Sequence, residues 1–257
     1  MTREAENQNR VTLVTGGARG IGLAIAQRFA ASGETVVIAD ILEDEGKESA
    51  EGIDGVFHQV DVASEDSVRL LVDDVERDTG PIGALVNSAG LLQTASTSAD
   101  MPMEEHDRIW QVNYRGTYLC CRAVGHRMAE RGAGAILNIG SINSLRVLPL
   151  PAYTPGKAAI KSLTELLAAE LGPGGVRVNA VAPGFTLTPA LQERIDSGER
   201  DLGKIERTTA LGRLVMPGEI AEAGYYLCSG QASAITGVCL PVDCGWLAAV
   251  TYKSFPG

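Results

Sequence analysis

The sequence predicts an α/β fold in which a parallel sheet carries helices on both faces. Apolar runs of strand length alternate with helical stretches along the chain, which is typical of a parallel sheet. A glycine-rich turn lies directly between the first expected strand and the first expected helix. The 257 residues contain no repeat and no stretch that reads as an interdomain linker. We therefore expect a single domain over residues 1–257.

The first half of the chain sets this alternation. Four strands are expected there: VTLVT (11–15), TVVIAD (35–40), VFHQVDV (56–62) and ALVNSAG (84–90). The helices between them are IGLAIAQRFAASG (21–33), a charged stretch at 43–51, and residues 65–79, which have Asp and Ser at their start. Gly33 supplies the stop signal of the first helix, because glycine commonly follows the last helical residue.

The second half continues the pattern with longer helices. The expected strands are GAILNIGS (134–141), VRVNAVAPG (176–184) and VCLPVD (238–243), and the expected helices are 104–131, 153–171 and 218–229. Crossovers between parallel strands should be right-handed. Residues 185–216 are rich in Thr, Gly and charge and fit neither pattern. An irregular segment of this length in a compact domain is usually a lid or binding loop, so we expect a substrate lid at about 185–216.

The composition narrows the class of partner. A formal net charge of −10 would repel a phosphate backbone, so nucleic acid is not an expected partner. No run of about 18 apolar residues occurs, so no membrane span is expected. The N-terminus, MTREAENQNR, is polar and has no apolar signal core. The expectation is a cytoplasmic enzyme.

Metal and disulfide chemistry find little support. The five cysteines are odd in number and form no C-x-x-C, and the three histidines lie in no metal-like cluster. We expect neither a disulfide framework nor a metal site. Proton chemistry should therefore use groups other than histidine.

The glycine-rich turn, TGGARGIG (15–22), has the chemistry of a phosphate cradle. Without Cβ atoms the backbone can turn sharply and approach phosphates, and the helix start offers free N–H groups. The third glycine of G-x-G-x-x-G is missing because Ile25 stands in its place, so the spacing alone also allows a purely structural turn. The residues expected at the cofactor are Gly16, Arg19, Gly20, Ile21 and Gly22.

Asp40 indicates which dinucleotide the turn would hold. It ends the second expected strand, 20 residues after Gly20, where an acid binds the ribose hydroxyls of NAD. Its carboxylate would repel the 2′-phosphate of NADP, whereas Arg19 could hold that phosphate. Because Asp40 stands at the strand end, where repulsion is poorly screened, we expect NAD(H), with Ile41 also at the cofactor and NADP(H) as the alternative.

Further motifs complete a recognisable set. They are NSAG (87–90), GS (140–141), Y-x-x-x-K (153–157) and VNAVAPGFTLTP (178–189). With the glycine turn and Asp40, they make residues 10–245 resemble the short-chain dehydrogenase/reductase superfamily. The resemblance implies a Rossmann-type fold with a seven-stranded parallel sheet, an oxidoreductase that uses NAD(H) or NADP(H) on CH–OH groups of small molecules, and a homotetramer packed through helices 104–131 and 153–171.

The resemblance also assigns roles. Ser141, Tyr153 and Lys157 resemble the catalytic trio, and Asn113 in VNYRGT resembles its fourth member. Asp61 and Val62 match the pair beside the adenine, and Asn87, Ala89 and Gly90 match the stretch beneath the adenosine half. Pro183, Gly184, Thr186 and Thr188 match the turn beside the nicotinamide, which Tyr153 and Lys157 also contact.

The spacing of Tyr153 and Lys157 suggests how they work. Residues four apart share a helix face, so the Lys157 ammonium and the oxidised nicotinamide should both lower the pKa of Tyr153. Tyr153 would then act as general acid/base, while Ser141 positions the substrate oxygen. The family pattern further implies that Lys157 binds the nicotinamide ribose and that Asn113 holds a water linking Lys157 to solvent.

Three departures from the family pattern stand out. The usual Y-S-A-S-K is here Tyr-Thr-Pro-Gly-Lys, and Pro155 is acceptable only in a first helical turn. Ser141 precedes Tyr153 by 12 residues, about one fewer than the family spacing, which makes Ser144 an accessory or substitute hydroxyl. DCGW replaces the frequent D-G-G near the C-terminus and puts the local loop conformation in doubt.

The substrate is less determined than the chemistry. Expected wall residues are Leu92, Gln93, Asn143, Ser144, Arg146, Leu148 and Phe185. Several are polar, which favours a polyol, sugar or small hydroxy-ketone. A steroid-type ketone and a 3-oxoacyl thioester are the alternatives, although the acidic net charge disfavours the acidic carrier of a thioester.

Other classes of protein remain as rivals. A cofactor-binding regulator without catalysis is one, opposed by the intact set of four catalytic residues. A hydrolase is another, but no G-x-S-x-G elbow with a positioned histidine occurs. An NAD-retaining epimerase or dehydratase is a third, and such relatives usually carry a longer C-terminal substrate domain.

Overall fold

A single sheet of seven parallel strands organises the chain in the computed structural model, which describes residues 10–253. The strands are β1 (Val11–Thr15), β2 (Thr35–Asp40), β3 (Val56–Gln59), β4 (Ile82–Asn87), β5 (Gly134–Ile139), β6 (Val176–Pro183) and β7 (Cys239–Val242). Their order across the sheet is β3-β2-β1-β4-β5-β6-β7. The α/β, Rossmann-type, single-domain prediction is therefore confirmed. The polar stretch that argued against a signal segment falls largely in residues 1–9, outside the described residues.

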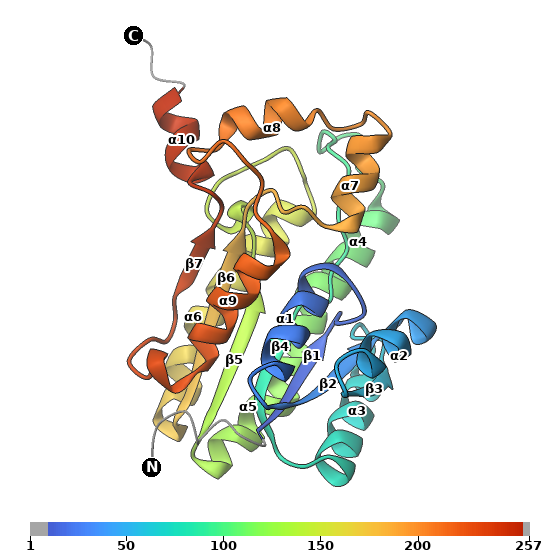
Figure 1. Ribbon diagram of the computed structural model, residues 1–257, viewed down its shortest axis with the longest axis vertical. Coiled ribbons are helices and arrows are strands. Elements are labelled where there is room, and N and C mark those ends of the chain that lie inside the picture. Colours follow the sequence, from blue (N-terminus) through green and yellow to red (C-terminus); the bar gives the residue numbers. More distant parts are fainter. Residues whose placement is uncertain (1–9, 254–257) are drawn as a thin grey trace.

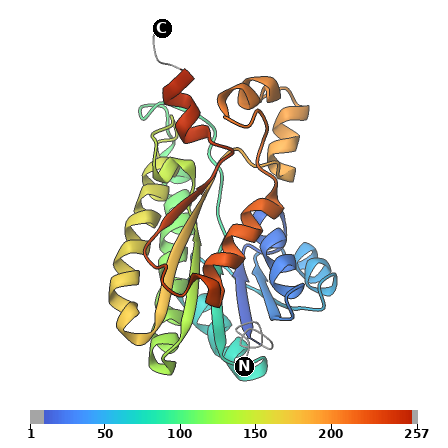
Figure 2. The ribbon, with the colours of Figure 1, turned by 60° about the vertical axis from the view of Figure 1, so that its left-hand side comes forward.

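Helices cover both faces of the sheet (Figures 1 and 2). They are α1 (Gly20–Ala30), α2 (Glu43–Glu51), α3 (Glu65–Asp78), α4 (Met103–Trp110), α5 (Thr117–Arg131), α6 (Tyr153–Leu171), α7 (Pro189–Asp196), α8 (Leu202–Thr208), α9 (Pro217–Cys228) and α10 (Trp246–Lys253). One core packs the inner sides of α3, α5 and α6 on the sheet, and a second packs α1 and α9 on the other face. Strands buried on both faces explain why their sequences read as continuous apolar runs.

The strand order places several of the sequence motifs at one edge of the sheet, where the carboxyl ends of the strands lie. β1 leads to β2 and β3 on one side and has β4 on its other side, so the chain direction across the sheet switches between β1 and β4. In open parallel sheets, ligands bind at the carboxyl ends of the strands beside such a switch. The glycine turn, Asp40 and Ser141 all follow or end strands at this edge.

The helix expected over 104–131 runs without a break from Met103 to Arg131 but is not α-helical throughout. α4 and α5 are joined by a π-helical stretch, Gln111–Gly116, that contains Asn113. A π-helix carries i→i+5 bonds and occurs mostly at functional positions. Hydrophobic periodicity over the whole stretch hides this local widening, which is why the sequence predicted one helix.

The lid segment also differs from its expectation. Residues 185–216 contain two short helices, α7 and α8, rather than irregular chain. Thr188 caps α7 by accepting a hydrogen bond from the Leu191 amide, and Asp201 caps α8 through the Lys204 amide. Together with α10, a helix that was not expected, they gather beyond the carboxyl ends of the strands (Figure 1).

The DCGW stretch keeps a tight turn despite its unusual sequence. Cys244 has φ +50° and Gly245 φ +74°, so Cys244 occupies a left-handed conformation that favours glycine. Asp243 stabilises the turn because its carboxylate accepts hydrogen bonds from the Gly245 and Leu247 amides at 2.8 and 2.9 Å. The cysteine therefore replaces glycine without loss of the turn.

Two general features complete the fold. All five cysteines are free thiols. Within residues 10–253, no helix combines the length and apolar character needed to cross a membrane.

Candidate active site

The turn between β1 and α1 is shaped by glycines that tolerate no side chain. Gly16 and Gly20 have φ of +67° and +61°. A Cβ on Gly22 would lie 2.1 Å from the carbonyl oxygen of Gly16, and one on Gly16 would lie 2.5 Å from the backbone of Ala89. The turn is thus pressed against its own helix and against the segment after β4. Such a close backbone cradle is what a pyrophosphate requires.

The N-terminus of α1 is open toward this edge. Its N-cap residue, Arg19, makes no side-chain cap, and no acidic residue stands in the first turn. The guanidinium of Arg19 is largely exposed and lies 4.0 Å from Glu45 of α2. The first amides of α1 and the positive end of its dipole can therefore bind an anion. These observations fit the phosphates of a dinucleotide.

Asp40 is fixed at the end of β2 by two backbone amides. Its carboxylate accepts hydrogen bonds from Ala18 at 3.0 Å and Leu42 at 3.1 Å. The first of these joins Asp40 directly to the glycine turn. Ile41 beside it is 61% exposed, which leaves its side chain free for a ligand at this edge.

The remaining adenosine-side residues divide into two groups. Val62 is buried, whereas Asp61 uses its carboxylate to hold the Ala63 amide at 2.9 Å. Ala89 and Gly90 lie in the loop after β4, but the side chain of Asn87 points into the core. Its amide nitrogen donates to Asn138 at 2.9 Å, and its oxygen has no partner among the described residues. The structure thus gives the Asn87 side chain a place in a buried polar network.

Tyr153 and Lys157 begin the long helix α6. Tyr153 is its first residue and Lys157 lies one turn later, with Nζ 5.5 Å from the centre of the Tyr153 ring. Pro155 falls in the first turn, where its missing N–H costs no helical bond. Lys157 Nζ also donates to the carbonyl of Ile139 at the end of β5, at 2.6 Å. The pair therefore shares one helix face.

Gln93 fixes the start of this helix, a role the sequence gave no sign of. Its side-chain oxygen accepts hydrogen bonds from the amides of Ala152 at 3.1 Å and Tyr153 at 2.9 Å. The first amides of a helix have no internal partner, and Gln93 supplies one from a loop sixty residues away. It also lines the pocket, as expected for a wall residue.

Ser141 is held by the short helical turn Ile142–Ser144. Its hydroxyl accepts a hydrogen bond from the Asn143 amide at 3.2 Å, and the Asn143 side chain donates to Thr154 of α6 at 2.8 Å. Ser144 instead donates to the carbonyl of Lys157 at 2.7 Å and accepts from the Ser141 amide. Ser144 is absent from the pocket wall and ties the turn to α6.

Asn113 anchors the opposite loop. Its side chain accepts from the Leu91 amide at 2.7 Å and donates to the Leu91 carbonyl at 2.9 Å. Its own carbonyl accepts the hydroxyl of Thr117 at 2.8 Å. Asn113 thus holds the loop after β4 against the π-helical stretch.

The pKa of Tyr153 differs from the value expected for a tyrosine beside Lys157. Burial raises the pKa of Tyr153 to about 12, and a hydrogen bond with Ser141 only partly opposes this. Burial also lowers the pKa of Lys157 to about 8. In the protein alone, the pKa of Tyr153 is therefore raised, where the sequence predicted a lowered one. Desolvation by the surrounding fold is the cause, because it disfavours both charged forms.

A pocket of about 210 Å³ opens beside these groups. Of the expected residues, its wall contains Ile21, Leu92, Gln93, Ser141, Asn143, Leu148, Tyr153, Pro183, Gly184, Phe185, Thr186 and Thr188. It also contains residues that were not expected: Ile139, Gly140, Ile142, Leu150, Leu191, Arg194 and Arg200. Arg146 lies outside it and donates to Thr251 of α10. The wall is more apolar than the sequence suggested.

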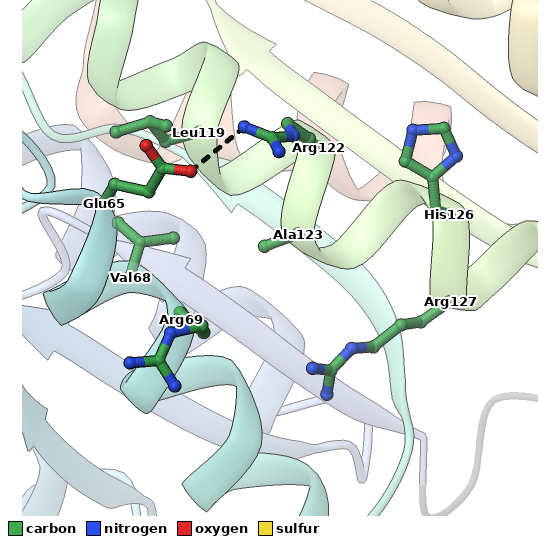
Figure 3. Close-up of a pocket in the computed structure, with 8 residues that line it drawn as sticks. All are labelled: Glu65, Val68, Arg69, Leu119, Arg122, Ala123, His126 and Arg127. Carbon is green, nitrogen blue, oxygen red and sulfur yellow. Dashed lines mark hydrogen bonds and ion pairs between the residues drawn. The ribbon is translucent and has the colours of Figure 1, made fainter.

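A second hollow, of about 240 Å³, lies between α3 and α5 (Figure 3). Its charged groups pair with one another or with neighbours, as Glu65 does with Arg122 at 3.1 Å and Arg127 with Glu76 at 3.1 Å. It contains none of the motif residues. The chemistry therefore points to the pocket at Ser141 and Tyr153.

Known proteins resemble this chain over nearly its whole length. A family model described as enoyl-(acyl carrier protein) reductase matches residues 16–247. A 3-alpha-(or 20-beta)-hydroxysteroid dehydrogenase of Mycobacterium tuberculosis (strain CDC 1551 / Oshkosh) is 38% identical over 249 residues, covering 96% of this chain and 92% of the relative. A cyclopentanol dehydrogenase of Comamonas sp. (strain NCIMB 9872) is 35% identical over 246 residues, covering 93% and 98%.

Of two further matches, one is to a much longer protein and the other to a structure described as an isomerase. An uncharacterized short-chain type dehydrogenase/reductase of Sinorhizobium fredii (strain NBRC 101917 / NGR234) is 39% identical over 244 residues, and the match covers 93% of this chain but 44% of that protein. A crystal structure described as ribose-5-phosphate isomerase from Brucella melitensis 16M superposes with a TM-score of 0.93 at 41% identity, covering 97% of this chain and 98% of that one.

Proposed function

The chain belongs to the short-chain dehydrogenase/reductase superfamily, and we propose that it interconverts a small secondary alcohol and its ketone with NAD(H). The observation that carries the proposal is that Ser141 and Tyr153 line one pocket, with Lys157 a turn below Tyr153 on the same helix. Oxidoreductase chemistry on alcohols and ketones follows from the family. The cofactor preference, the residue roles and the substrate are our proposals.

The cofactor's place follows from the cradle described above. Gly16, Gly20 and Gly22 would let the backbone approach its pyrophosphate beside the first amides of α1, because an added Cβ collides with backbone at Gly16 and Gly22 and Gly20 has a positive φ. Asp40 would bind the ribose hydroxyls of the adenosine half and repel a 2′-phosphate. Thr186 and Thr188, on the pocket wall, would face the nicotinamide half. When bound, the cofactor accepts or supplies the hydride.

Tyr153 would accept the proton of the substrate hydroxyl in oxidation and donate it in reduction. With its pKa raised to about 12 by burial, the phenol is neutral at physiological pH and serves as a proton donor to a carbonyl oxygen. Alcohol oxidation requires the phenolate, which a positive charge brought close to Tyr153 would favour. Lys157, one turn away, is such a charge below its pKa of about 8.

Ser141 and its supports fix the geometry. The Ser141 hydroxyl would hold the substrate oxygen near Tyr153, while Asn143 links the Ser141 turn to α6 through Thr154. Gln93 holds the helix start from the other side. Positioning of this kind can account for several powers of ten in rate.

The size of the pocket supports a small substrate. A volume of about 210 Å³ lies below the usual range of sites for drug-sized ligands, and the polar wall residues Gln93 and Asn143 suit a polyol, sugar or hydroxy-ketone. A steroid-type ketone is the alternative, favoured by the apolar wall of Leu148, Leu150 and Phe185 and by the relative named as a hydroxysteroid dehydrogenase.

The test is NADH formation from NAD⁺ with a panel of polyols, sugars, cyclic alcohols and hydroxysteroids. Oxidation of a small polar or cyclic alcohol supports the proposal, and exclusive oxidation of steroids moves the function to the alternative. Tight NADH binding with no turnover across the panel, in either direction, would instead favour a cofactor-binding regulator.

We also propose a homotetramer packed through α4–α5 and α6. Apolar side chains stand exposed on these helices, with Tyr118 of α5 40% and Leu166 of α6 59% exposed. Burial of such side chains is the usual driving force of subunit association. Sedimentation at micromolar concentration should give four times the chain mass, and a stable monomer would contradict the proposal.

A further inference from the structure

Two arginines stand out in the wall of the active-site pocket. Arg194 belongs to α7 and Arg200 follows it, so the lid brings both to the site. They are the only charged side chains among the described residues that line this pocket, and no carboxylate accompanies them there. This local positive charge contrasts with the net charge of −10 of the whole chain.

A backbone hydrogen bond holds the two arginines close together in one turn of the chain. The Arg200 amide donates to the Arg194 carbonyl at 2.9 Å, and the chain between them turns at Gly198, whose φ is +77°. The positive φ favours glycine, so the return of the chain from α7 toward the pocket is built into the sequence. Arg194 and Arg200 therefore enter the wall from one closed turn.

Neither guanidinium is strongly neutralised. Arg194 lies 3.5 Å from Glu199, whose side chain is 44% exposed, and such exposed pairs contribute little. Arg200 is a half-buried residue, and across the described range 10–253 its guanidinium makes no hydrogen bond or ion pair. A partly desolvated cation without a partner, in a largely apolar wall, can gain from binding an anion.

We propose that Arg200, assisted by Arg194, binds a carboxylate or phosphate group of the substrate. This inference rests on the proposed function and narrows its substrate class to hydroxy acids or phosphorylated alcohols. The planar fork of a guanidinium matches both groups in a bidentate manner. The anion would sit at the lid end of the pocket while the reacting carbinol meets Ser141 and Tyr153. An uncharged steroid would leave the guanidinium unpaired.

The anion could have a second source, since the cofactor also carries phosphates and Thr186 and Thr188 share the same wall. The two sources predict different effects. A substrate anion makes Arg200 matter for substrate affinity only, whereas a cofactor phosphate makes it matter for NADH affinity. Measuring both in the same variant separates them.

The experiment uses the full chain with NAD⁺ or NADH bound and compares compounds that differ only in the anionic group. The pairs are 3-hydroxybutyrate with butan-2-ol, gluconate with glucitol, and glycerol 3-phosphate with glycerol. NADH formation gives KM and kcat, and calorimetric titration of each compound into the NADH-loaded protein gives binding without turnover. The variants are Arg200→Gln, Arg200→Lys and, as matched control, Arg207→Gln, an exposed arginine of α8 outside the pocket.

The proposal predicts that at least one anionic compound binds about ten- to hundredfold more tightly than its neutral partner, in line with a charge-assisted bidentate contact. Arg200→Gln should remove this preference with NADH affinity unchanged, Arg200→Lys should keep part of it, and Arg207→Gln should keep all of it. Equal or weaker binding of every anionic compound would overturn the proposal. So would a loss of NADH affinity in Arg200→Gln without a change in anion preference.

The outcome also separates this inference from the proposed function. Turnover of neutral alcohols, with no anionic compound bound more tightly than its neutral partner, overturns the anion site and retains the oxidoreductase proposal. Binding of an anion that depends on Arg200, with no turnover of any alcohol or ketone, supports the site and contradicts the proposed reaction.

Discussion

The side-chain oxygen of Gln93 accepts a hydrogen bond from the backbone amide of Tyr153 at 2.9 Å. The same oxygen accepts from Ala152 at 3.1 Å, so one amide side chain holds the start of α6 and, with it, the phenol of Tyr153. Helix starts are usually capped by a residue adjacent in sequence. Here the cap comes from the loop after β4, which makes the position of Tyr153 depend on that loop.

Replacing Gln93 should therefore impair catalysis through position. Gln93→Leu leaves two helix-start amides unpaired, and we expect a free energy of unfolding lower by about 1–3 kcal/mol and a kcat lower by about ten- to hundredfold. Gln93→Glu is the matched variant, because it keeps an acceptor and its charge suits a helix N-terminus. Recovery of kcat in Gln93→Glu, by steady-state kinetics, supports the positioning role; equal kcat losses in both variants would contradict it.

Asp40 should decide between the two dinucleotides. Asp40→Ala removes the carboxylate held at the end of β2 by Ala18 and Leu42, and with it the repulsion of a 2′-phosphate. We expect the ratio of kcat/KM for NADH over NADPH to fall by about tenfold or more, since tenfold needs about 1.4 kcal/mol. Asp44→Ala, at an exposed site on α2, controls for the loss of a surface charge. An unchanged ratio in Asp40→Ala would refute the assignment.

Replacing Gly22 tests whether the turn between β1 and α1 binds the cofactor. In Gly22→Ala the new Cβ would lie 2.1 Å from the Gly16 carbonyl oxygen, so the turn or the helix must move. We expect loss of measurable NADH binding in a fluorescence titration. Gly218→Ala is the control, because Gly218 is an exposed residue of α9 with no atom within 4 Å of an added Cβ; it should bind NADH normally. Normal binding by Gly22→Ala would show that the turn does not cradle the cofactor.

Lys157 should leave a signature in the pH dependence of stability. Burial lowers its pKa to about 8 from an ordinary 10.5, so between these values the unfolded chain binds a proton that the folded chain does not. The stability of the cofactor-free protein relative to Lys157→Met should therefore rise from pH 8 to pH 10, by on the order of 3 kcal/mol at most. The buried cysteines have pKa values raised by burial and act in the opposite direction.

The comparison with Lys157→Met removes that cysteine contribution, because both proteins contain the same thiols. Urea unfolding at intervals across this pH range measures the difference. A constant difference would show that the folded protein keeps Lys157 charged throughout.

Much of the fold was visible in the sequence, because strands buried on both faces are continuous apolar runs and the helices between them carry clear end signals. All seven expected strands exist, although several end earlier than predicted. For example, β3 ends at Gln59, whereas the sequence predicted a strand over 56–62. The π-helical stretch around Asn113 was not predicted because it alters the backbone hydrogen bonding and leaves no mark in the amino-acid composition. The helices α7 and α8 were not predicted because they are short and polar.

The site was predictable where it depends on local spacing and unpredictable where it depends on tertiary contacts. Tyr153 and Lys157 share a helix face because they are four residues apart. The cap from Gln93 and the entry of Arg200 into the pocket bring together segments far apart in sequence. The raised pKa of Tyr153 was missed for the same reason, because its cause is burial by the surrounding fold.

We propose that Tyr153 transfers the proton during alcohol oxidation or ketone reduction. The most direct measurement compares kcat/KM of wild type and Tyr153→Phe with an alcohol from the panel at saturating NAD⁺, together with the NADH dissociation constant of each. Loss of the acid/base group should lower kcat/KM by about 10²–10⁴-fold while NADH binding stays within about threefold of wild type, a difference of less than about 0.7 kcal/mol. A Tyr153→Phe protein that binds NADH and oxidises the alcohol within tenfold of wild type would contradict the account.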